Sequence, residues 1–327
     1  MMRRTRIVCI SDTHNYTFKL PKGDVLLHAG DLTNQGSYAE LSKTVKWIED
    51  ANFEAKIVIA GNHDITLDKD FYARHGASFH NKNPQSPDSC ISLLKSSPSI
   101  TYLDHSSATI RLSSSSSGPQ TQFTVFGSPY SPEYGEWAFY YPPASSEDAQ
   151  PKPRIWDDIP LNTDIVVTHT PPHGHCDYVA PGEKRPDGCE ALRRALWRVR
   201  PRLAVCGHIH DGRGAETIRW NLDSSDTVFA ESGTISWEDP GAGEGNKKTS
   251  LVDLTSRKGG CHLDNDGSKI LGLSDADIDS LTGRLGRRET CVVNAAIMKS
   301  KYPHVGGKKY NKPIVVDLEL PVLEPGE

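Results

Sequence analysis

Five short apolar runs recur along the first two thirds of the chain, and each of them ends in polar residues. Their apolar parts are nearly continuous and rich in β-branched residues, which is typical of strands that are buried on both faces. We therefore predict five buried strands. With the polar residues that follow each run, the segments are 6–14, 24–31, 56–64, 164–172 and 203–210.

Two other segments place apolar residues at helical spacing and separate some of these strands. In 37–51, Ser37 followed by Glu40 fits a capping box at the start of a helix. The second segment, 188–199, has Asp187 as a candidate cap. The alternation of strands and helices predicts an α/β fold rather than an all-β fold.

The rest of the chain carries weaker signals. Short strand patterns lie between residues 100 and 126, with a flexible serine-rich loop at 113–121. The segment 238–288 is rich in Gly, Asp, Ser and Lys, which predicts a mostly irregular insertion. Two further strand candidates follow it, at 290–297 and 313–320.

Bulk composition changes this picture little. The length suits one large domain, and we predict a single domain over 1–327. A net charge of -5 and the lack of any run of about 18 apolar residues indicate no membrane partner and no bulk nucleic-acid binding. Seven cysteines without a repeated spacing favour reduced thiols and an intracellular, cytoplasmic protein.

Candidate chemistry is concentrated at the ends of the predicted strands. In open α/β sheets, ligands bind at the edge formed by the carboxyl ends of the strands. That arrangement would bring nine polar residues from five strands to one rim. They are Asp12, His14, Asp31, Asn62, His63, Asp64, His169, His208 and His210.

The types of these residues suit divalent metal ions. Carboxylate oxygens, amide oxygens and imidazole nitrogens are ligands for Mn, Fe, Zn or Mg, and the absence of cysteine argues against a structural zinc site. Two aspartates, an asparagine and four histidines are too many for one small cation. They are about right for two metals that share one carboxylate, roughly 3.5–4 Å apart, which is an arrangement that supports phosphoryl chemistry.

Five short motifs, in this order, resemble those of the calcineurin-like metallophosphoesterases. They are SDTH (11–14), GD (30–31), GNHD (61–64), TH (168–169) and GHIH (207–210). The surrounding stretches look closest to the brain-type metallophosphoesterase-domain proteins, which act on cyclic nucleotides. The resemblance implies a four-layer α/β/β/α sandwich of two mixed sheets. It also implies two divalent metal ions, with Mn, Fe or Zn favoured and Mg or Ni as alternatives.

The resemblance assigns a role to each matched position. Seven residues would bind metal: Asp12, His14 and His210 the first ion, Asn62, His169 and His208 the second ion, and Asp31 both. A hydroxide between the two metals would attack phosphorus in line. His63 would donate a hydrogen bond or a proton to the leaving oxygen, and Asp64 would orient His63.

Candidates for substrate contact lie on loops near these motifs. His173 and His175 follow the TH motif on a loop that should overhang the site. Tyr130 and Trp137 belong to an aromatic cluster that either forms a wall for a base or aryl group or packs as the base of a lid. Asn294 follows a strand candidate and either reaches the site or forms a structural turn.

The resemblance predicts a dinuclear-metal phosphohydrolase, most simply a phosphodiesterase on a small substrate such as a cyclic nucleotide. The stretch GDLTNQG (30–36) lacks the arginine that protein phosphatases of this superfamily carry there, which counts against a phosphoprotein substrate. Some animal relatives have glycine at the position of His208, so the histidine predicts a fully loaded second metal. Two alternatives stay open: a phosphomonoesterase or nuclease on the same site, and a non-catalytic relative that binds nucleotide or protein.

Overall fold

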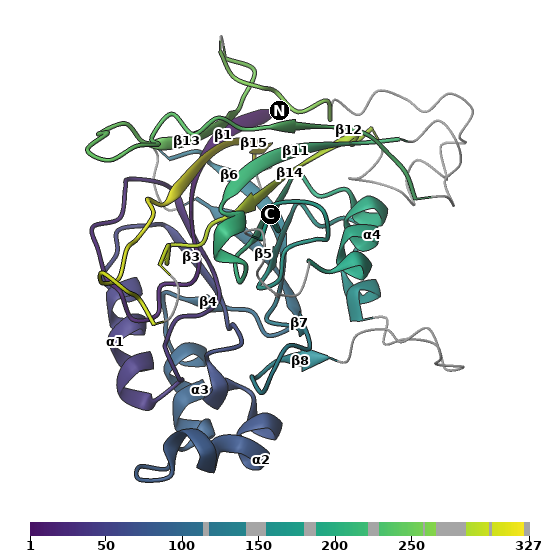
Figure 1. Ribbon diagram of the computed structural model, residues 1–327. Coiled ribbons are helices and arrows are strands. Elements are labelled where there is room, and N and C mark those ends of the chain that lie inside the picture. Colours follow the sequence, from purple (N-terminus) through teal and green to yellow (C-terminus); the bar gives the residue numbers. More distant parts are fainter. Residues whose placement is uncertain are drawn as a thin grey trace, which may run out of the picture.

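Two large sheets form the centre of the computed structural model, and helices lie on both sides of them (Figure 1). The structure describes residues 1–113, 118–141, 155–179, 188–221, 229–257, 259–265, 286–300 and 303–323. Within those residues, no helix has the length and apolar character that crossing a membrane requires.

The first sheet has six strands in the order β13-β15-β1-β2-β3-β4. Their bounds are β1 (Met2–Ile10), β2 (Val25–Ala29), β3 (Ala55–Ile59), β4 (Thr101–Tyr102), β13 (Ser250–Leu254) and β15 (Ile314–Pro321). Strands β1 to β4 are parallel neighbours, whereas β15 runs antiparallel to β1. Strands β1, β2 and β3 therefore end at the same edge of the sheet.

The second sheet has seven strands in the order β12-β11-β14-β10-β9-β6-β5. Their bounds are β5 (Ser106–Leu112), β6 (Thr121–Ser128), β9 (Ile165–Thr168), β10 (Leu203–Cys206), β11 (Gly214–Trp220), β12 (Glu231–Ser236) and β14 (Glu289–Asn294). Strands β6, β9, β10 and β14 are parallel, and the remaining neighbours are antiparallel. A separate short ladder joins β7 (Ser131–Pro132) to β8 (Tyr140–Tyr141).

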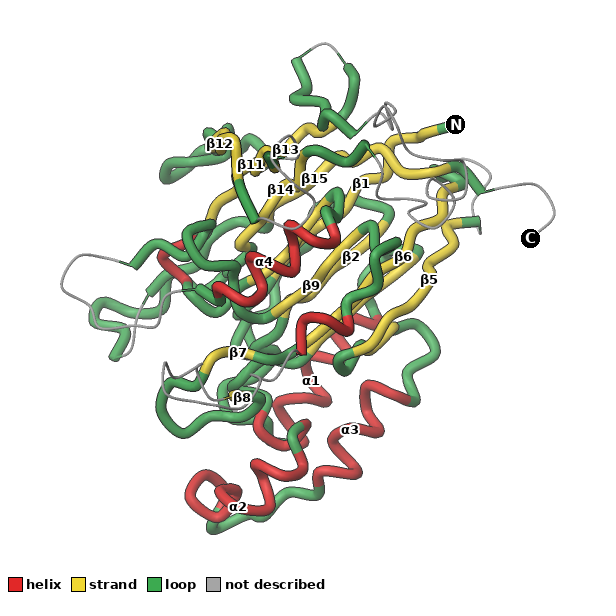
Figure 2. The backbone as a smooth tube through the Cα atoms, turned by 90° about the vertical axis from the view of Figure 1, so that its right-hand side faces the viewer, coloured by secondary structure: helices red, strands yellow, loops and turns green. Residues whose placement is uncertain are grey.

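The two sheets pack face to face over a continuous apolar core. Ile7 and Ile59 from the first sheet share one buried cluster with Phe123, Val167 and Val293 from the second sheet. The helices are α1 (Tyr38–Glu49), α2 (Lys69–His80), α3 (Pro87–Lys95) and α4 (Glu190–Val199). Side chains of α1, α2 and α3 pack with the outer face of the first sheet, and α4 covers the second sheet (Figure 2). These layers confirm the predicted α/β/β/α sandwich of two mixed sheets.

Local sequence explains where the two predicted helices begin. The Ser37 side chain accepts from the Glu40 N–H and the Glu40 side chain accepts from the Ser37 N–H, which confirms the capping box at the start of α1. At α4, the Cys189 sulfur accepts from the Leu192 N–H and takes the capping position. Asp187, the predicted cap, lies outside the described residues.

All five predicted buried strands are present, as β1, β2, β3, β9 and β10, and the two late candidates form β14 and β15. Within the segment predicted to be mostly irregular, 238–288, the residues Ser250–Leu254 form a strand that the sequence did not indicate. This segment forms β13 because its alternate side chains, Ser250, Val252 and Leu254, are buried beside β15. Within the predicted loop and insertion, residues 114–117, 258 and 266–285 lie outside the described residues.

Candidate metal centre

The candidate ligands lie together at the carboxyl ends of five strands from the two sheets. Strands β1, β2 and β3 of the first sheet and β9 and β10 of the second sheet are each followed by candidate residues within four positions. The backbone turns sharply there, because Asp12, His14, Asp31 and His208 have φ angles of 52°, 44°, 54° and 66°. Such left-handed conformations cost non-glycine residues about 1–3 kcal/mol each and cluster at functional sites.

Two glycines allow these turns to approach one another closely. Gly30 has a φ of 96°, and a Cβ there would lie 2.6 Å from both the Ala60 carbonyl oxygen and His169 Nδ1. A Cβ on Gly207 would overlap the side chains of Ser11 and Asp12. Packing therefore requires both glycines, and backbone conformation also requires the one at position 30.

Asp12, His14 and His210 form a first donor group, in which one ligand atom from each residue lies within 4.8 Å of the others. His210 Nε2 lies 3.3 Å from Asp12 Oδ1. The His208 N–H lies 3.1 and 3.0 Å from the two carboxylate oxygens of Asp12 and orients them. His14 Nδ1 donates to the Thr33 carbonyl at 3.0 Å, so a neutral His14 keeps its Nε2 lone pair for a cation.

Asn62, His169 and His208 form a second donor group. Asn62 Oδ1 lies 2.9 Å from His169 Nε2 and 2.9 Å from His208 Nδ1. His169 Nδ1 donates to the Ala29 carbonyl at 2.9 Å, so the Nε2 lone pair of a neutral His169 faces the amide oxygen directly. In that neutral form the two lone pairs repel, and a cation between them would remove the repulsion. Burial lowers the pKa of His169, but Asp31 and Asp12 outweigh it and raise the pKa, so the protonated form instead donates from Nε2 to the amide oxygen. This geometry fits a bound metal ion.

Asp31 lies between the two groups. Its Oδ2 is 3.6 Å from His14 Nε2, and its Oδ1 is 3.4 Å from His169 Nε2. Asp12, Asp31 and His169 also place one ligand atom each within 4.8 Å of one another. Each oxygen of the Asp31 carboxylate thus faces a histidine of a different donor group.

Burial and neighbouring charges set the protonation of these groups. Burial lowers the pKa of His14 to about 4 and that of His208 to about 3. Burial alone would raise the pKa of Asp12, but the nearby His210 and His169 hold it well below its usual range. Near neutral pH His14 and His208 are therefore neutral and Asp12 is ionised, which are the forms that bind cations. The residues present therefore fit two divalent ions.

His63 lies beside the donor groups at the wall of the cavity. Its backbone N–H donates to Asp31 Oδ1 at 2.9 Å, and its Nδ1 donates to the Asn34 carbonyl at 2.7 Å. Its ring lies against the indole of Trp137, with 3.9 Å between the ring centroids. Three contacts from different segments therefore hold this imidazole in place.

Asp64 does not orient His63, contrary to the expectation from the resemblance. Its buried carboxylate accepts from the Gly61 N–H at 2.9 Å and the Leu32 N–H at 3.1 Å, and from the N–H and hydroxyl of Thr33 at 3.0 and 2.7 Å. These bonds join the turn after β3 to the turn after β2. Asp64 is therefore a positioning residue for the backbone that carries the ligands.

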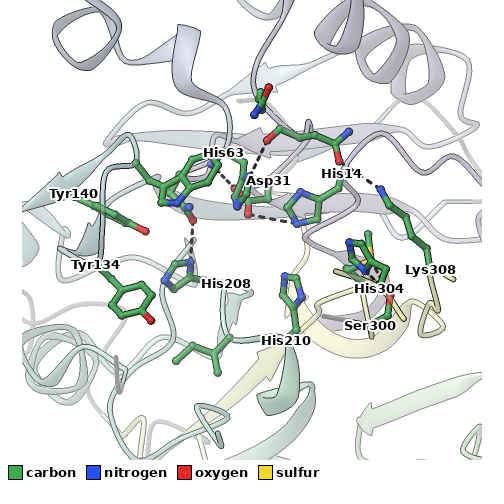
Figure 3. Close-up of a pocket in the computed structure, with 16 residues that line it drawn as sticks. His14, Asp31, His63, Tyr134, Tyr140, His208, His210, Ser300, His304 and Lys308 are labelled. Atoms are coloured by element: carbon green, nitrogen blue, oxygen red, sulfur yellow. Dashed lines mark hydrogen bonds and ion pairs between the residues drawn. The ribbon is translucent and has the colours of Figure 1, made fainter. Parts of the chain in front are cut away.

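A cavity of about 900 Å³ opens over the donor groups (Figure 3). Tyr134, Trp137 and Tyr140, from the segment around β7 and β8, line one side of it. Two candidate ligands that the cavity exposes, His208 and His210, lie in its middle in the view of Figure 3. The site is thus an open pocket with an aromatic side.

Of the predicted substrate contacts, one lines this cavity and four are absent from its described lining. Trp137 lines it, but Tyr130, His173, His175 and Asn294 are not among the described lining residues. Asn294 is fully buried, and its side-chain amide donates to the Cys176 and Ile209 carbonyls at 2.9 and 2.8 Å. These bonds hold the backbone of the GHIH turn, which supports a structural role for Asn294.

His173, His175 and Tyr130 also have structural partners. His173 Nδ1 lies 3.6 Å from Asp177 Oδ2. His175 is only 3% exposed and lies between two glutamates. Tyr130 packs in the aromatic cluster over the sheet edge.

Several lining residues were not predicted from the sequence. They are Asn34, Gln35, Tyr140, Ile209, Met298, Ser300, His304 and Lys308. The segment 298–308 did carry a signal, because it combines proline, two glycines, histidine and lysines between two strand candidates. That composition is typical of a functional loop.

Comparison with known proteins adds a family and several relatives. The family model described as calcineurin-like phosphoesterase matches residues 5–212, a span that contains all seven candidate metal ligands. A probable rhamnogalacturonate lyase C of Emericella nidulans is 41% identical over 219 residues, which are 66% of this chain and 18% of that protein. The human and mouse proteins named metallophosphoesterase domain-containing protein 1 are each 37% identical over 219 residues, 64% of this chain and 62% of those proteins. The chain thus spans less than two thirds of the length of these relatives.

Proposed function

The chain belongs to the calcineurin-like phosphoesterase family, and from that premise we propose that it is a metal-dependent phosphodiesterase that acts on a small substrate such as a cyclic nucleotide. The observation that carries the proposal is the position of Asp31, whose two oxygens face two separate donor groups. A carboxylate shared between two metals would hold them close enough to stabilise both the attacking and the leaving oxygen of a phosphoryl group.

The proposed ligands divide as the two donor groups do. Asp31 would be shared, with Asp12, His14 and His210 on one ion and Asn62, His169 and His208 on the other. Four imidazoles among seven ligands favour Mn, Fe or Zn over Mg, which prefers oxygen. Such ions supply Lewis-acid stabilisation of charge on the phosphoryl oxygens and a nucleophile generated from water at neutral pH.

His63 is the proposed general acid. Because its Nδ1 donates to the Asn34 carbonyl, Nε2 is the atom that would deliver a proton to the leaving oxygen. Trp137 covers one face of the ring and limits its rotation. The bond from the His63 N–H to Asp31 keeps the acid at a constant position relative to the shared carboxylate.

The cavity supports a small substrate. Its volume of about 900 Å³ lies within the range of roughly 300–1,000 Å³ that small-molecule sites occupy. Tyr134, Trp137 and Tyr140 offer flat surfaces to a base or aryl group. None of the described lining residues is an arginine, which agrees with the missing arginine of the GDLTNQG stretch.

A substrate panel tests the proposal. The chain would be stripped of metal, reloaded separately with Mn, Fe, Zn, Mg or Ni, and assayed on bis(4-nitrophenyl) phosphate, 4-nitrophenyl phosphate, cyclic nucleotides and single-stranded DNA. We expect two metals per chain and kcat/KM for diesters that exceeds that for the monoester by about tenfold or more. A preference for the monoester or for DNA would support the alternative enzymes. A metal-loaded chain that hydrolyses none of these compounds would indicate a binding protein.

A further inference from the structure

The end of the cavity opposite the aromatic side chains is basic and polar. Ser300, His304 and Lys308 line it, and all three come from the segment between β14 and β15 (Figure 3). Lys308 is exposed, and its Nζ lies 3.5 Å from the neutral amide oxygen of Asn34. Within the described part of the chain, no ion pair joins Lys308 to a carboxylate.

Acidic side chains do not offset this positive charge inside the cavity. Asp31, at the metal centre, is the only carboxylate among the described lining residues. Glu40 is bonded to Asn34, but it does not line the cavity, and its carboxylate accepts from N–H groups of Asn34 and Ser37. A cationic group in a cavity that lacks a counter-charge attracts anions.

Hydrogen bonds join the described residues on the two sides of this segment. Ser300 Oγ lies 2.9 Å from His304 Nδ1 and accepts from the Lys309 N–H at 2.9 Å. The Lys299 N–H donates to the Lys309 carbonyl at 2.9 Å, which closes the base of the loop. His304 and Lys308 therefore lie close to hydrogen bonds that join Ser300 to His304 and to Lys309.

The cavity then has three chemically different parts in a row. The aromatic side chains lie at one end, the donor groups in the middle, and Lys308 with His304 at the other end (Figure 3). Asn34 connects the last two parts, because its carbonyl accepts from His63 and its side-chain oxygen faces Lys308. A substrate that fills this row needs a flat group, a phosphodiester and an anionic group.

We propose that the preferred substrate is a nucleotide-like phosphodiester that carries a second phosphate, and that Lys308, assisted by His304 and Ser300, binds this second phosphate. The inference rests on the proposed function for the position of the scissile ester. It goes further by assigning a substrate class and a residue that selects it. A phosphate held by a lysine ammonium forms charge-assisted hydrogen bonds, which are the stronger kind.

Binding without turnover gives the first test. The Mn-loaded full chain would be titrated calorimetrically with AMP and with adenosine 3′,5′-bisphosphate, which differ only in the second phosphate. We expect the bisphosphate to bind about five- to tenfold more tightly. In Lys308→Met this ratio should fall to near one, whereas Lys308→Arg should restore most of it.

Lys309→Met is the matched control. Lys309 is the adjacent exposed lysine of the same loop, but it lines a different cavity, so this variant removes the same charge without altering the proposed site. We expect it to keep the wild-type ratio. Equal affinities of the wild-type chain for AMP and the bisphosphate would overturn the inference, and so would an equal loss in the Lys308→Met and Lys309→Met variants.

Turnover separates this inference from the proposed function. The 4-nitrophenyl ester of thymidine 5′-phosphate would be compared with the same diester bearing a 3′-phosphate. We expect kcat/KM to rise about five- to tenfold with the 3′-phosphate, mainly through KM, and to lose this gain in Lys308→Met. Equal hydrolysis of both diesters would leave the hydrolase standing and remove the inference. If the chain bound the bisphosphate preferentially but hydrolysed none of the esters, the inference would stand and the proposed hydrolase function would be removed.

Discussion

At the level of single residues, the centre depends on which ring nitrogen of each histidine faces the cavity. His14 and His169 each donate from Nδ1 to a backbone carbonyl, which leaves Nε2 as the nitrogen available to a metal ion. His208 instead presents Nδ1 to the Asn62 oxygen. In His208, Nδ1 rather than Nε2 is therefore the nitrogen available to a metal ion.

His208→Ala is expected to lose most of the phosphodiesterase activity and part of the bound metal. Removal of this ligand should leave Asn62 and His169 to hold the second ion with Asp31, so kcat/KM should fall by about 100-fold or more. Metal content by elemental analysis and diester kinetics would check this. His173→Ala, outside the cavity, should keep wild-type values. Wild-type turnover with two metals in His208→Ala would refute the assignment.

Asp64→Asn should destabilise the fold rather than alter the proton transfer by His63. An amide at this position places an NH2 group among N–H donors and loses hydrogen bonds that the buried carboxyl group accepts, which should lower the free energy of unfolding by about 2–3 kcal/mol. Urea denaturation would measure it. Asp50→Asn, at an exposed carboxylate, should change stability by less than about 0.5 kcal/mol. A stable Asp64→Asn with a shifted pH-rate profile would instead support a direct role on His63.

At the level of elements, the parallel strand ends determine the site, and their turns tolerate little added volume. Gly207 lies where the turn after β10 crosses the turn after β1, against Ser11 and Asp12. This contact makes the spacing of the two turns a condition for metal binding.

Gly207→Ala should therefore weaken metal binding. The added methyl group must displace Asp12 or the backbone, so we expect the affinity for Mn to fall by about tenfold, with a loss of about 1–3 kcal/mol in unfolding free energy. Metal titration and urea denaturation would measure both. Gly233→Ala in β12 is the control, because a Cβ there meets no atom within 4 Å. Equal metal affinity in the Gly207 variant and the wild-type chain would show that the turns have room to move.

Sequence patterns predicted the ligand-bearing elements because each combines a buried strand with polar residues directly after it. They missed α2, in which only Phe71 and Gly76 are buried, so no apolar stripe marks it. They also missed α3, although Ser86 caps it and Pro87 occupies its first turn. Strand β13 was hidden within a polar segment because it contributes only alternate buried side chains.

The rim of the cavity could not be predicted in the same way. The aromatic side comes from residues 134–140 and the basic end from residues 298–308, which are far apart in the chain. Only the packing of the complete sandwich places them at the two ends of one cavity. Local patterns report burial and turns, and they carry no information about which loops face each other.

At the level of the whole molecule, a partly buried ionic cluster joins β11, β12, α4 and the loop after β9. Arg193 of α4 donates to Glu231 of β12 at 2.8 and 2.6 Å. His175 Nε2 lies 3.1 Å from Glu231, and its Nδ1 lies 3.3 Å from Glu216 of β11 without hydrogen-bond geometry. The loop after β9 is thereby tied to α4, β11 and β12.

This cluster should make stability depend on pH. Burial lowers the pKa of His175, but the two glutamates outweigh it and raise the pKa to about 9. The pKa of His175 in the folded chain exceeds the unfolded value of about 6.5. Its contribution to the free energy of unfolding is therefore complete below about pH 6.5 and is lost as the pH rises through 9. We expect Tm to fall by about 2–4 °C over this range.

His175→Gln should remove this part of the pH dependence, since glutamine does not titrate. Thermal unfolding between pH 6 and 10 would show a flatter profile for the variant, while His173→Gln should follow the wild-type curve. The acidic end of the profile depends on Glu231. Burial alone would raise the pKa of Glu231, but His175 and Arg193 outweigh burial and lower this pKa to about 2. That contribution is present above about pH 4.5 and is lost as the pH falls through 2. An identical slope in wild type and His175→Gln above pH 6.5 would contradict the prediction.

The donor groups also have a consequence for how the chain matures. Each group takes ligands from both sheets: Asp12 and His14 meet His210 across the core, and Asn62 meets His169 and His208. A nascent chain whose two halves have not yet docked therefore cannot assemble either group. Retention of metal would report that docking is complete, and a cell short of these ions would accumulate copies that are more easily opened and degraded.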